Sequence, residues 1–309
     1  MTPGRGVEAE GVLGRFASLR QHQRDGQRSP HKPLLVLLAL GRLAADGSSA
    51  LPWSVCEQAL SALIAEFGPP SRTGRAQSAA YPFTRLRSDG VWILDQDVQM
   101  DRVGPLVDRH VTGQFEPSVE SALRADPALA QSVARSLVLS NFPETIAPDV
   151  LEAAGLNPDD VLGSADGPAA PRRRSPQWRF AVLQAWDRQC AFCGYDGQLG
   201  GATAGIDAAH VRWFTFEGPD ALDNGLALCA LHHKLFDLGV LGLDLELQVQ
   251  VSAAFSARTS AGRAIYELHG LPLRPRPGTF VPAARHLEWH HREVFKGEPL
   301  SVRPTRPGT

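Results

Sequence analysis

The sequence predicts an α+β protein with two domains: a mainly α N-terminal domain with a small β-ribbon, and a C-terminal domain of short strands and helices. At 309 residues the chain is longer than one ordinary core requires. Apolar residues at helical spacing dominate its first half. Residues 157–176 are rich in Pro, Gly, Asp and Arg, which is typical of a linker. We therefore expect domains over 1–156 and 177–309.

The N-terminal domain is predicted from its apolar pattern. Pro33 stands in the first turn of a helix whose residues 33–40 are almost all apolar, so this helix should be buried. A turn at 88–90 precedes a short strand candidate, Gly90–Leu94. This order is typical of winged-helix-like or other mainly α domains. Further helices are expected over 54–67, 117–126, 127–140 and 148–154.

The composition is that of a soluble globular protein, because 43% of the residues are hydrophobic and 21% are charged. The first ten residues have neither the basic-apolar pattern nor the cleavage site of a signal peptide. No apolar run reaches the length that spans a membrane. We therefore expect a cytoplasmic protein that makes no membrane contact.

Basic residues are clustered although the formal net charge is -2. The stretch from Arg15 to Lys32 carries five basic residues and two histidines against a single acid, Asp25. Two more basic stretches lie over 72–87 and 172–179. Local patches of this kind can bind phosphates in a mildly acidic chain. Solvated surface is the alternative explanation for each of them.

Three of the four cysteines lie within forty residues of sequence. Cys190 and Cys193 form one pair with two residues between them, and Cys229 and His232 form a second. This spacing lets each pair reach one tetrahedral ion, and three cysteines with one histidine are a closed structural zinc set. A metal site is also more natural than disulfides in a cytosolic chain. We expect Zn²⁺ here, whereas Cys56, in an apolar helical pattern, should be a buried core thiol.

The insert between the two pairs carries a more specific pattern. Residues 208–211 read AAHV, residues 223–229 read DNGLALC, and residues 232–237 read HHKLFD. In order, spacing and flanking residues this pattern resembles the HNH endonuclease family, in particular its McrA-like branch. The resemblance implies a zinc-stapled ββα-metal fold and the hydrolysis of DNA phosphodiester bonds.

The chemistry of that reaction explains the residue types. Phosphodiester hydrolysis needs a base that takes a proton from water and a divalent cation that absorbs charge on the phosphate. Neutral histidine suits the first task, so His210 is the expected general base. Asn224 is expected to hold His210 or its strand in register, and His233 to bind the catalytic metal, Mg²⁺ or Mn²⁺. In the alternative, His210 and Asn224 are ordinary polar residues around a structural zinc.

One position departs from the family pattern. Many HNH enzymes have an acid or a histidine directly before the base histidine, as a metal ligand, whereas this chain has Ala209. Asp207 is the nearest substitute, and it is expected either to bind the metal or to contact a residue that does. The segment 286–297 resembles the closing helix of these nucleases, so Trp289 and Phe295 should be core residues. Four other histidines are expected to serve packing or the surface: His269, His286, His290 and His291.

The N-terminal half carries a second, less specific resemblance. The strings Ser29–Leu35, Ala80–Phe83 and Asp89–Trp92 resemble the sulfur-binding domain of restriction enzymes that recognise phosphorothioate-modified DNA. The resemblance covers most of residues 10–155. A sulfur atom in place of a phosphate oxygen is larger and less strongly hydrated, so it should prefer a shallow apolar pocket.

Tyr81 and Pro82 are the expected floor of that pocket, with a guanidinium near them to neutralise the phosphate. A simple turn with a packed aromatic ring is the alternative for these two residues. By resemblance, Arg109 and His110 are the candidates that complete the pocket. Three basic residues are expected to grip the flanking DNA backbone: Arg28, His31 and Lys32.

Together these predictions describe a modification-dependent (type IV) restriction endonuclease that binds phosphorothioate-modified double-stranded DNA and cuts it nearby by a one-metal mechanism. One alternative is an HNH endonuclease that reads methylated cytosine or another mark, although the N-terminal half has no obvious aromatic cluster for a flipped base. The other is a non-catalytic, zinc-containing DNA reader. A homodimer would supply the two active sites that a double-strand cut needs, but the sequence identifies no interface.

Overall fold

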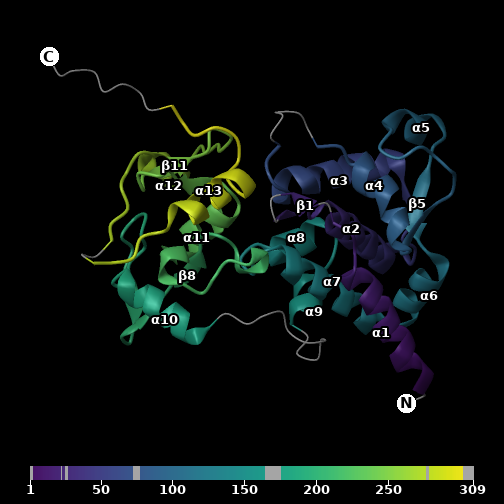
Figure 1. The fold of residues 1–309 in the computed structure, drawn as a ribbon, viewed down its shortest axis with the longest axis horizontal. Coiled ribbons are helices and arrows are strands. Elements are labelled where there is room, and N and C mark those ends of the chain that lie inside the picture. Colours follow the sequence, from purple (N-terminus) through teal and green to yellow (C-terminus); the bar gives the residue numbers. More distant parts are fainter. Residues whose placement is uncertain are drawn as a thin grey trace. The chain divides into compact units, whose positions relative to one another are not determined.

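The structure, a computed structural model, describes residues 3–21, 23–24, 27–71, 77–163, 175–275 and 278–301. The chain divides into two compact units, unit 1 with residues 1–171 and unit 2 with residues 172–309 (Figure 1). Residues 164–174, which make up most of the predicted linker and include its three arginines, lie outside the described part of the chain, as do residues 72–76 of a predicted basic stretch. No helix within the described residues is long and apolar enough to cross a membrane.

Helices form most of unit 1 (Figure 1). Helix α1 (Pro3–Ala17) was not predicted, because its glycines lower the helical propensity of the segment. It forms because Val12 and Phe16 are buried where it packs against α6 and α7. The other elements are β1 (Gln23–Arg24), β2 (Gln27–Arg28), α2 (His31–Asp46), β3 (Leu51–Pro52), α3 (Trp53–Phe67), α4 (Ala80–Arg85), η1 (Leu86–Asp89), β4 (Trp92–Leu94), α5 (Val103–Asp108), β5 (Thr112–Phe115), α6 (Pro117–Ala125), α7 (Pro127–Asn141), α8 (Ala147–Ala153) and α9 (Pro158–Leu162).

The core of unit 1 is built on α2 and a three-stranded antiparallel sheet of order β3-β5-β4. The run from Pro33 to Leu37 is buried, as predicted from the almost unbroken apolar run over residues 33–40. The rings of Trp53, Phe83 and Trp92 meet edge to face, with centroids 5.1 and 5.9 Å apart. These contacts bind α3, α4 and the sheet into one core. Cys56 is fully buried as predicted, and burial raises the pKa of its thiol to about 12.

Two segments of unit 1 differ from simple expectation. Tyr81 and Pro82 lie in α4 rather than in a turn, and the Tyr81 side chain is exposed rather than packed. A helix accepts proline in its first turn, because the first N–H groups have no partner inside the helix. Ordered structure also continues past residue 156, since α9 packs against α7 and α8 and buries Val161.

Unit 2 is built around β8 (Ile206–His210), β9 (Gly225–Cys229) and α11 (Ala230–Asp237), which follow one another as two antiparallel strands and a helix. His210 pairs with Gly225 at one end of the two strands, and Ile206 pairs with Cys229 at the other. This ββα arrangement confirms the fold predicted for the C-terminal domain. The other elements are α10 (Pro176–Ala185), β6 (Gln198–Leu199), β7 (Ala202–Thr203), η2 (Phe214–Phe216), η3 (Leu222–Asn224), β10 (Leu241–Leu243), β11 (Val249–Val251), α12 (Ser260–Arg263), η4 (Tyr266–Leu268) and α13 (Ala284–Glu293).

Helix α10 packs closely on the β8–β9 pair because Gly225 has no side chain. A Cβ at this position would lie 2.5 Å from Cγ2 of Val182 and 3.3 Å from Cζ2 of Trp178. The glycine therefore lets α10 reach the end of β8, where His210 lies. Trp289 and Phe295 are buried as predicted.

Candidate metal centres and ligand pocket

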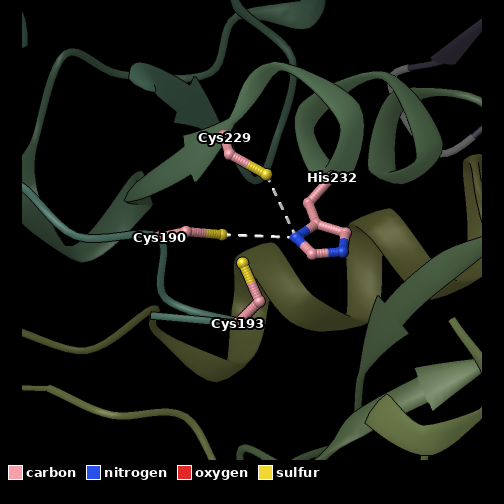
Figure 2. A group of neighbouring side chains, drawn as sticks. All are labelled: Cys190, Cys193, Cys229 and His232. Atoms are coloured by element: carbon pink, nitrogen blue, oxygen red, sulfur yellow. Dashed lines mark hydrogen bonds between the residues drawn. The ribbon is translucent and has the colours of Figure 1, made fainter. Parts of the chain in front are cut away.

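Cys190, Cys193, Cys229 and His232 converge in unit 2, and their ligand atoms all lie within 4.8 Å of one another. Nδ1 of His232 is 3.4 Å from Sγ of Cys190 and 3.2 Å from Sγ of Cys229, and Figure 2 shows the sulfur atoms gathered around this nitrogen. The first two cysteines follow α10, whereas Cys229 ends β9 and His232 lies in the first turn of α11. A cluster of this composition could hold a tetrahedral metal ion.

The three thiols are too close to ionise independently. Hydrogen bonds from Cys229 and His232 lower the pKa of the Cys190 thiol to about 3. The hydrogen bond to Cys190 in turn raises the pKa of Cys229, and burial raises that of Cys193. A bound cation would let the three cysteines ionise together, because it binds each of them as a thiolate.

His210 ends β8, and its side chain is buried. Its Nε2 lies 2.8 Å from Oδ1 of Asp220. Its ring stacks on the indole of Trp178, with centroids 3.7 Å apart and an interplanar angle of 15°, and Phe214 approaches to 5.4 Å between centroids. A carboxylate at Nε2 favours the tautomer that carries its proton on this atom and its lone pair on Nδ1.

Asn224 fastens the loop that leaves β8, and its side chain is fully buried. Its Oδ1 accepts a hydrogen bond from the backbone N of Arg212 at 2.8 Å. Its Nδ2 donates to the carbonyl oxygens of Arg212 and Pro219, both at 3.1 Å. These bonds fix the backbone immediately beyond His210.

His233 contacts a carboxylate through each of its ring nitrogens. Nε2 lies 3.4 Å from Oδ2 of Asp237, one helical turn later, and Nδ1 lies 4.0 Å from Oδ2 of Asp207. Nδ1 is buried and has no hydrogen-bond partner among the described residues. His233, followed by Arg179, lowers the pKa of Asp207, so this carboxylate is ionised at neutral pH. A buried imidazole nitrogen that lacks a hydrogen-bond partner and a carboxylate oxygen beside it are two ligand atoms that suit a divalent cation.

Unit 1 contains a pocket of about 930 Å³. It brings together four residues predicted to bind DNA: His31 and Lys32 from the first turn of α2, and Tyr81 and Pro82 from α4. The remaining lining residues are Arg20, Gln21, Ser29, Arg85, Ser88, Gln99, Met100, Asp101 and Arg102.

Several cations of this pocket are paired with aspartates. Lys32 and Arg20 both contact Asp89, whose side chain is buried. Arg85 pairs with Asp101, and its guanidinium carbon lies 5.7 Å from the centroid of the Tyr81 ring. Lys32 is therefore largely buried in an ion pair rather than extended into solvent.

Three other predicted residues are not among those that line the pocket. Arg28 is exposed in β2. Arg109 follows α5, and its Nη1 donates to the carbonyl oxygen of Asp97 at 3.0 Å. His110 is exposed in a left-handed backbone conformation with φ 51°.

Two family models match the chain. Residues 9–159 match the ScoMcrA-like DNA sulfur-binding domain, and residues 190–244 match an HNH endonuclease. One chain thus carries a segment similar to a DNA sulfur-binding domain, followed by a segment similar to an HNH endonuclease. The first match lies within unit 1, and the second includes the Cys/His cluster together with His210, Asn224 and His233. Both resemblances stated from the sequence are confirmed.

Several solved structures are similar to parts of the chain, whereas no curated protein sequence matches it. The sulfur-binding domain of SprMcrA in complex with phosphorothioated DNA is 22% identical, with a TM-score of 0.41 over 49% of this chain and 96% of that one. The modification-dependent TagI restriction endonuclease is 26% identical, with a TM-score of 0.31 over 45% and 41% of the two chains. The type IV phosphorothioation-dependent restriction endonuclease ScoMcrA is 14% identical, with a TM-score of 0.36 over 72% and 93%.

Sequence reasoning missed several residues of both sites. In the HNH domain these are Trp178, Asp220 and Asp237, which contact His210 or His233. The sequence shows Asp220 only as one of several acids between His210 and Asn224, and nothing in it singles out the one that contacts His210. In the sulfur-binding domain, reasoning missed the segment 99–102, whose signal is an exposed methionine within a polar run.

Proposed function

We propose that the protein is a modification-dependent (type IV) restriction endonuclease that binds phosphorothioate-modified DNA and hydrolyses phosphodiester bonds nearby. The observation that carries the proposal is the presence of two matches on one chain: residues 9–159 match a DNA sulfur-binding domain, and residues 190–244, which include His210, Asn224 and His233, match an HNH endonuclease. Contacts of a nuclease site fall mainly on phosphates and sugars, so a separate reader domain is what makes cutting selective.

The pocket of the sulfur-binding domain supports the reading step. Tyr81 and Met100 are exposed beside Pro82 and offer the apolar surface that a weakly hydrated sulfur atom prefers. Arg85 and Arg102 bring positive charge to the same pocket. The ion pair with Asp101 holds the Arg85 guanidinium in place before DNA arrives, which lowers the entropy lost on binding.

The HNH domain supports a one-metal hydrolysis. His210 would take the proton of the attacking water, and Asn224 would keep the following backbone in position. His233 and Asp207 would hold a divalent cation such as Mg²⁺ or Mn²⁺, with Asp237 orienting the His233 ring. When bound, the cation supplies the positive charge that stabilises the phosphate and the leaving oxygen.

A structural zinc ion is the natural occupant of the Cys190, Cys193, Cys229 and His232 cluster. These ligands tie the segment after α10 to the junction of β9 and α11. Zinc would therefore fix the start of α11, which carries His233, to the end of β9, the strand that pairs with the strand of His210.

Cleavage of a duplex with a single phosphorothioate linkage tests the proposal. The wild type should cut with Mg²⁺ or Mn²⁺ and stop on addition of EDTA. His210→Ala should bind the duplex normally and cut roughly 10²–10⁴ times more slowly, which is the usual contribution of a general base. His291→Ala is the matched control, because His291 is an exposed histidine of α13 in the same domain. Equal cutting by wild type and His210→Ala would contradict the proposal.

The same assay separates the two alternatives. A reader of methylated cytosine would select a duplex that carries this base over the phosphorothioate duplex. A non-catalytic reader would bind the phosphorothioate duplex and cut it with neither metal.

A further inference from the structure

The expected general base has a carboxylate partner outside the HNH motif. We propose that Asp220 is a positioning residue for His210, and that Asp220 and Trp178 form a clamp that fixes the tautomer and the plane of its ring. The inference rests on the proposed function, because it takes His210 as the base of the hydrolysis.

The two oxygens of the Asp220 carboxylate hold two different elements. Oδ1 lies 2.8 Å from Nε2 of His210, and Oδ2 accepts a hydrogen bond from the backbone N of Ser175 at 3.0 Å. Ser175 is the N-cap of α10, and its Oγ accepts from the backbone N of Trp178 at 3.3 Å. The Asp220 side chain is 19% exposed, so water screens these contacts little. The carboxylate thus joins the start of α10 to the end of β8.

Trp178 provides the second half of the clamp. Its indole lies flat against the His210 ring, and its Nε1 donates to the carbonyl oxygen of Ala221 at 3.0 Å. Ala221 follows Asp220 directly, so one helix and one loop hold the imidazole together. The contact with Asp220 restrains the His210 ring within its plane, and the stacked indole restrains it perpendicular to that plane. Together they leave the ring little freedom to rotate.

This arrangement has a direct chemical consequence. With the Nε2 proton held by Asp220, the lone pair of the neutral imidazole is on Nδ1. A proton taken from water would therefore go to Nδ1, while the Nε2 proton stays in place. The carboxylate then stabilises the imidazolium without itself being protonated. Trp178 and Phe214, whose rings lie against His210, are themselves uncharged.

Asp223 offers a matched control, because it lies three residues further along the same loop. Its side chain pairs with Arg285 of α13 rather than with a histidine. Asp223→Asn removes the same charge from the same loop and should leave the base untouched.

The test compares Asp220→Asn with Asp223→Asn in the full chain, on the phosphorothioate duplex, over a range of pH. Asp220→Asn should lower kcat about 10- to 100-fold, as losses of orienting partners usually do. KM should stay unchanged. The acidic limb of the pH-rate profile should move to lower pH, because the protonated imidazole has lost its counter-charge. Asp223→Asn should change none of these. A purely structural Asp220 would lower thermal stability and leave the profile in place, which would overturn the inference.

A second measurement needs no variant of Asp220. The ¹⁵N shifts of the His210 ring, assigned by their loss in His210→Ala, should show the tautomer with its proton on Nε2. A proton on Nδ1 would overturn the inference even if Asp220→Asn fails to fold. The two proposals fail differently: an active His210→Ala removes the proposed base, whereas an inactive His210→Ala with a fully active Asp220→Asn removes only the clamp.

Discussion

The two sites of the molecule are assembled in opposite ways. The HNH site draws its candidate ligands and its base from one stretch, residues 190–237, and most of them stand on β8, β9 and α11. The pocket of the sulfur-binding domain collects residues 20–21, 29–32, 81–88 and 99–102, which meet only through tertiary packing. The geometry of the first site depends on the register of β8 and β9 and on the Cys/His cluster. The geometry of the second depends on the core that α2, α4 and the sheet form.

Their electrostatics differ as well. In the HNH domain, thiols and imidazoles are crowded together, and the Cys/His cluster is arranged as if around a cation. In the pocket, Arg20, Lys32 and Arg85 already have aspartate partners. The pocket is therefore organised before any ligand binds, whereas the Cys/His cluster is the part of the molecule that we expect to depend most on a bound ion. Variants should separate these two kinds of site.

Loss of a cluster ligand should give the largest effect. Cys229→Ala should unfold the HNH domain and leave the sulfur-binding domain folded, because structural zinc contributes about 10 kcal/mol or more to small domains. Calorimetry and zinc analysis should show one lost transition and lost zinc, with binding of phosphorothioate DNA retained. Cys56→Ala is the control, since it removes a buried thiol from the other domain. An unchanged HNH transition in Cys229→Ala would contradict a structural metal.

Overpacking beside the base should give the next largest effect. In Gly225→Ala the new methyl group would lie 2.5 Å from Val182, so α10 must shift away from β8 and β9. We expect a loss of about 1–3 kcal/mol in the stability of the HNH domain, together with slower cutting. Gly104→Ala, where nothing lies within 4 Å of the added atom, should be neutral in denaturant titrations. Equal behaviour of the two variants would show that close packing of α10 is unimportant.

The two sites also differ in how much of them the sequence predicts, because one comes from a single stretch and the other from distant segments. The Cys190, Cys193, Cys229 and His232 cluster was predictable because spacing alone constrains it, and the burial of α2 was predictable because its residues 33–40 are all apolar. Asp220 was not predictable, because its contact with His210 depends on the path of an irregular loop. For the same reason the segment 99–102 could not be placed beside Tyr81. The roles of His210, Asn224, His233 and the pocket residues remain predictions for the experiments described.

A smaller effect is expected in the pocket. Tyr81→Ala removes an exposed ring and the support that it gives to Arg85. Discrimination between phosphorothioate and ordinary duplexes should fall about tenfold, or about 1.4 kcal/mol, in competition binding. Tyr195→Ala provides the control, because Tyr195 is similarly exposed in the HNH domain. Retained discrimination in Tyr81→Ala would remove this ring from the sulfur site.

The smallest effect at neutral pH is expected at His290, because its contribution to the stability of the HNH domain changes only under acid conditions. Burial lowers the pKa of His290 to about 3 from an ordinary 6.5, so only the unfolded state takes up this proton between those values. The domain therefore loses stability as the pH falls from 6.5 toward 3. His290→Phe should make unfolding free energy less dependent on pH in this window, and His291→Ala should not. An equal slope for wild type and His290→Phe would contradict the burial argument.

The central claim is that one domain selects DNA and the other cuts it. The most direct test is the binding of His210→Ala, which should not cut, to two duplexes that differ only in one phosphorothioate linkage, beside cleavage of the same duplexes by the wild type. We expect His210→Ala to bind the sulfur duplex more tightly than the ordinary duplex, and the wild type to cut the sulfur duplex alone. Equal affinity for the two duplexes, with equal cutting, would contradict the claim.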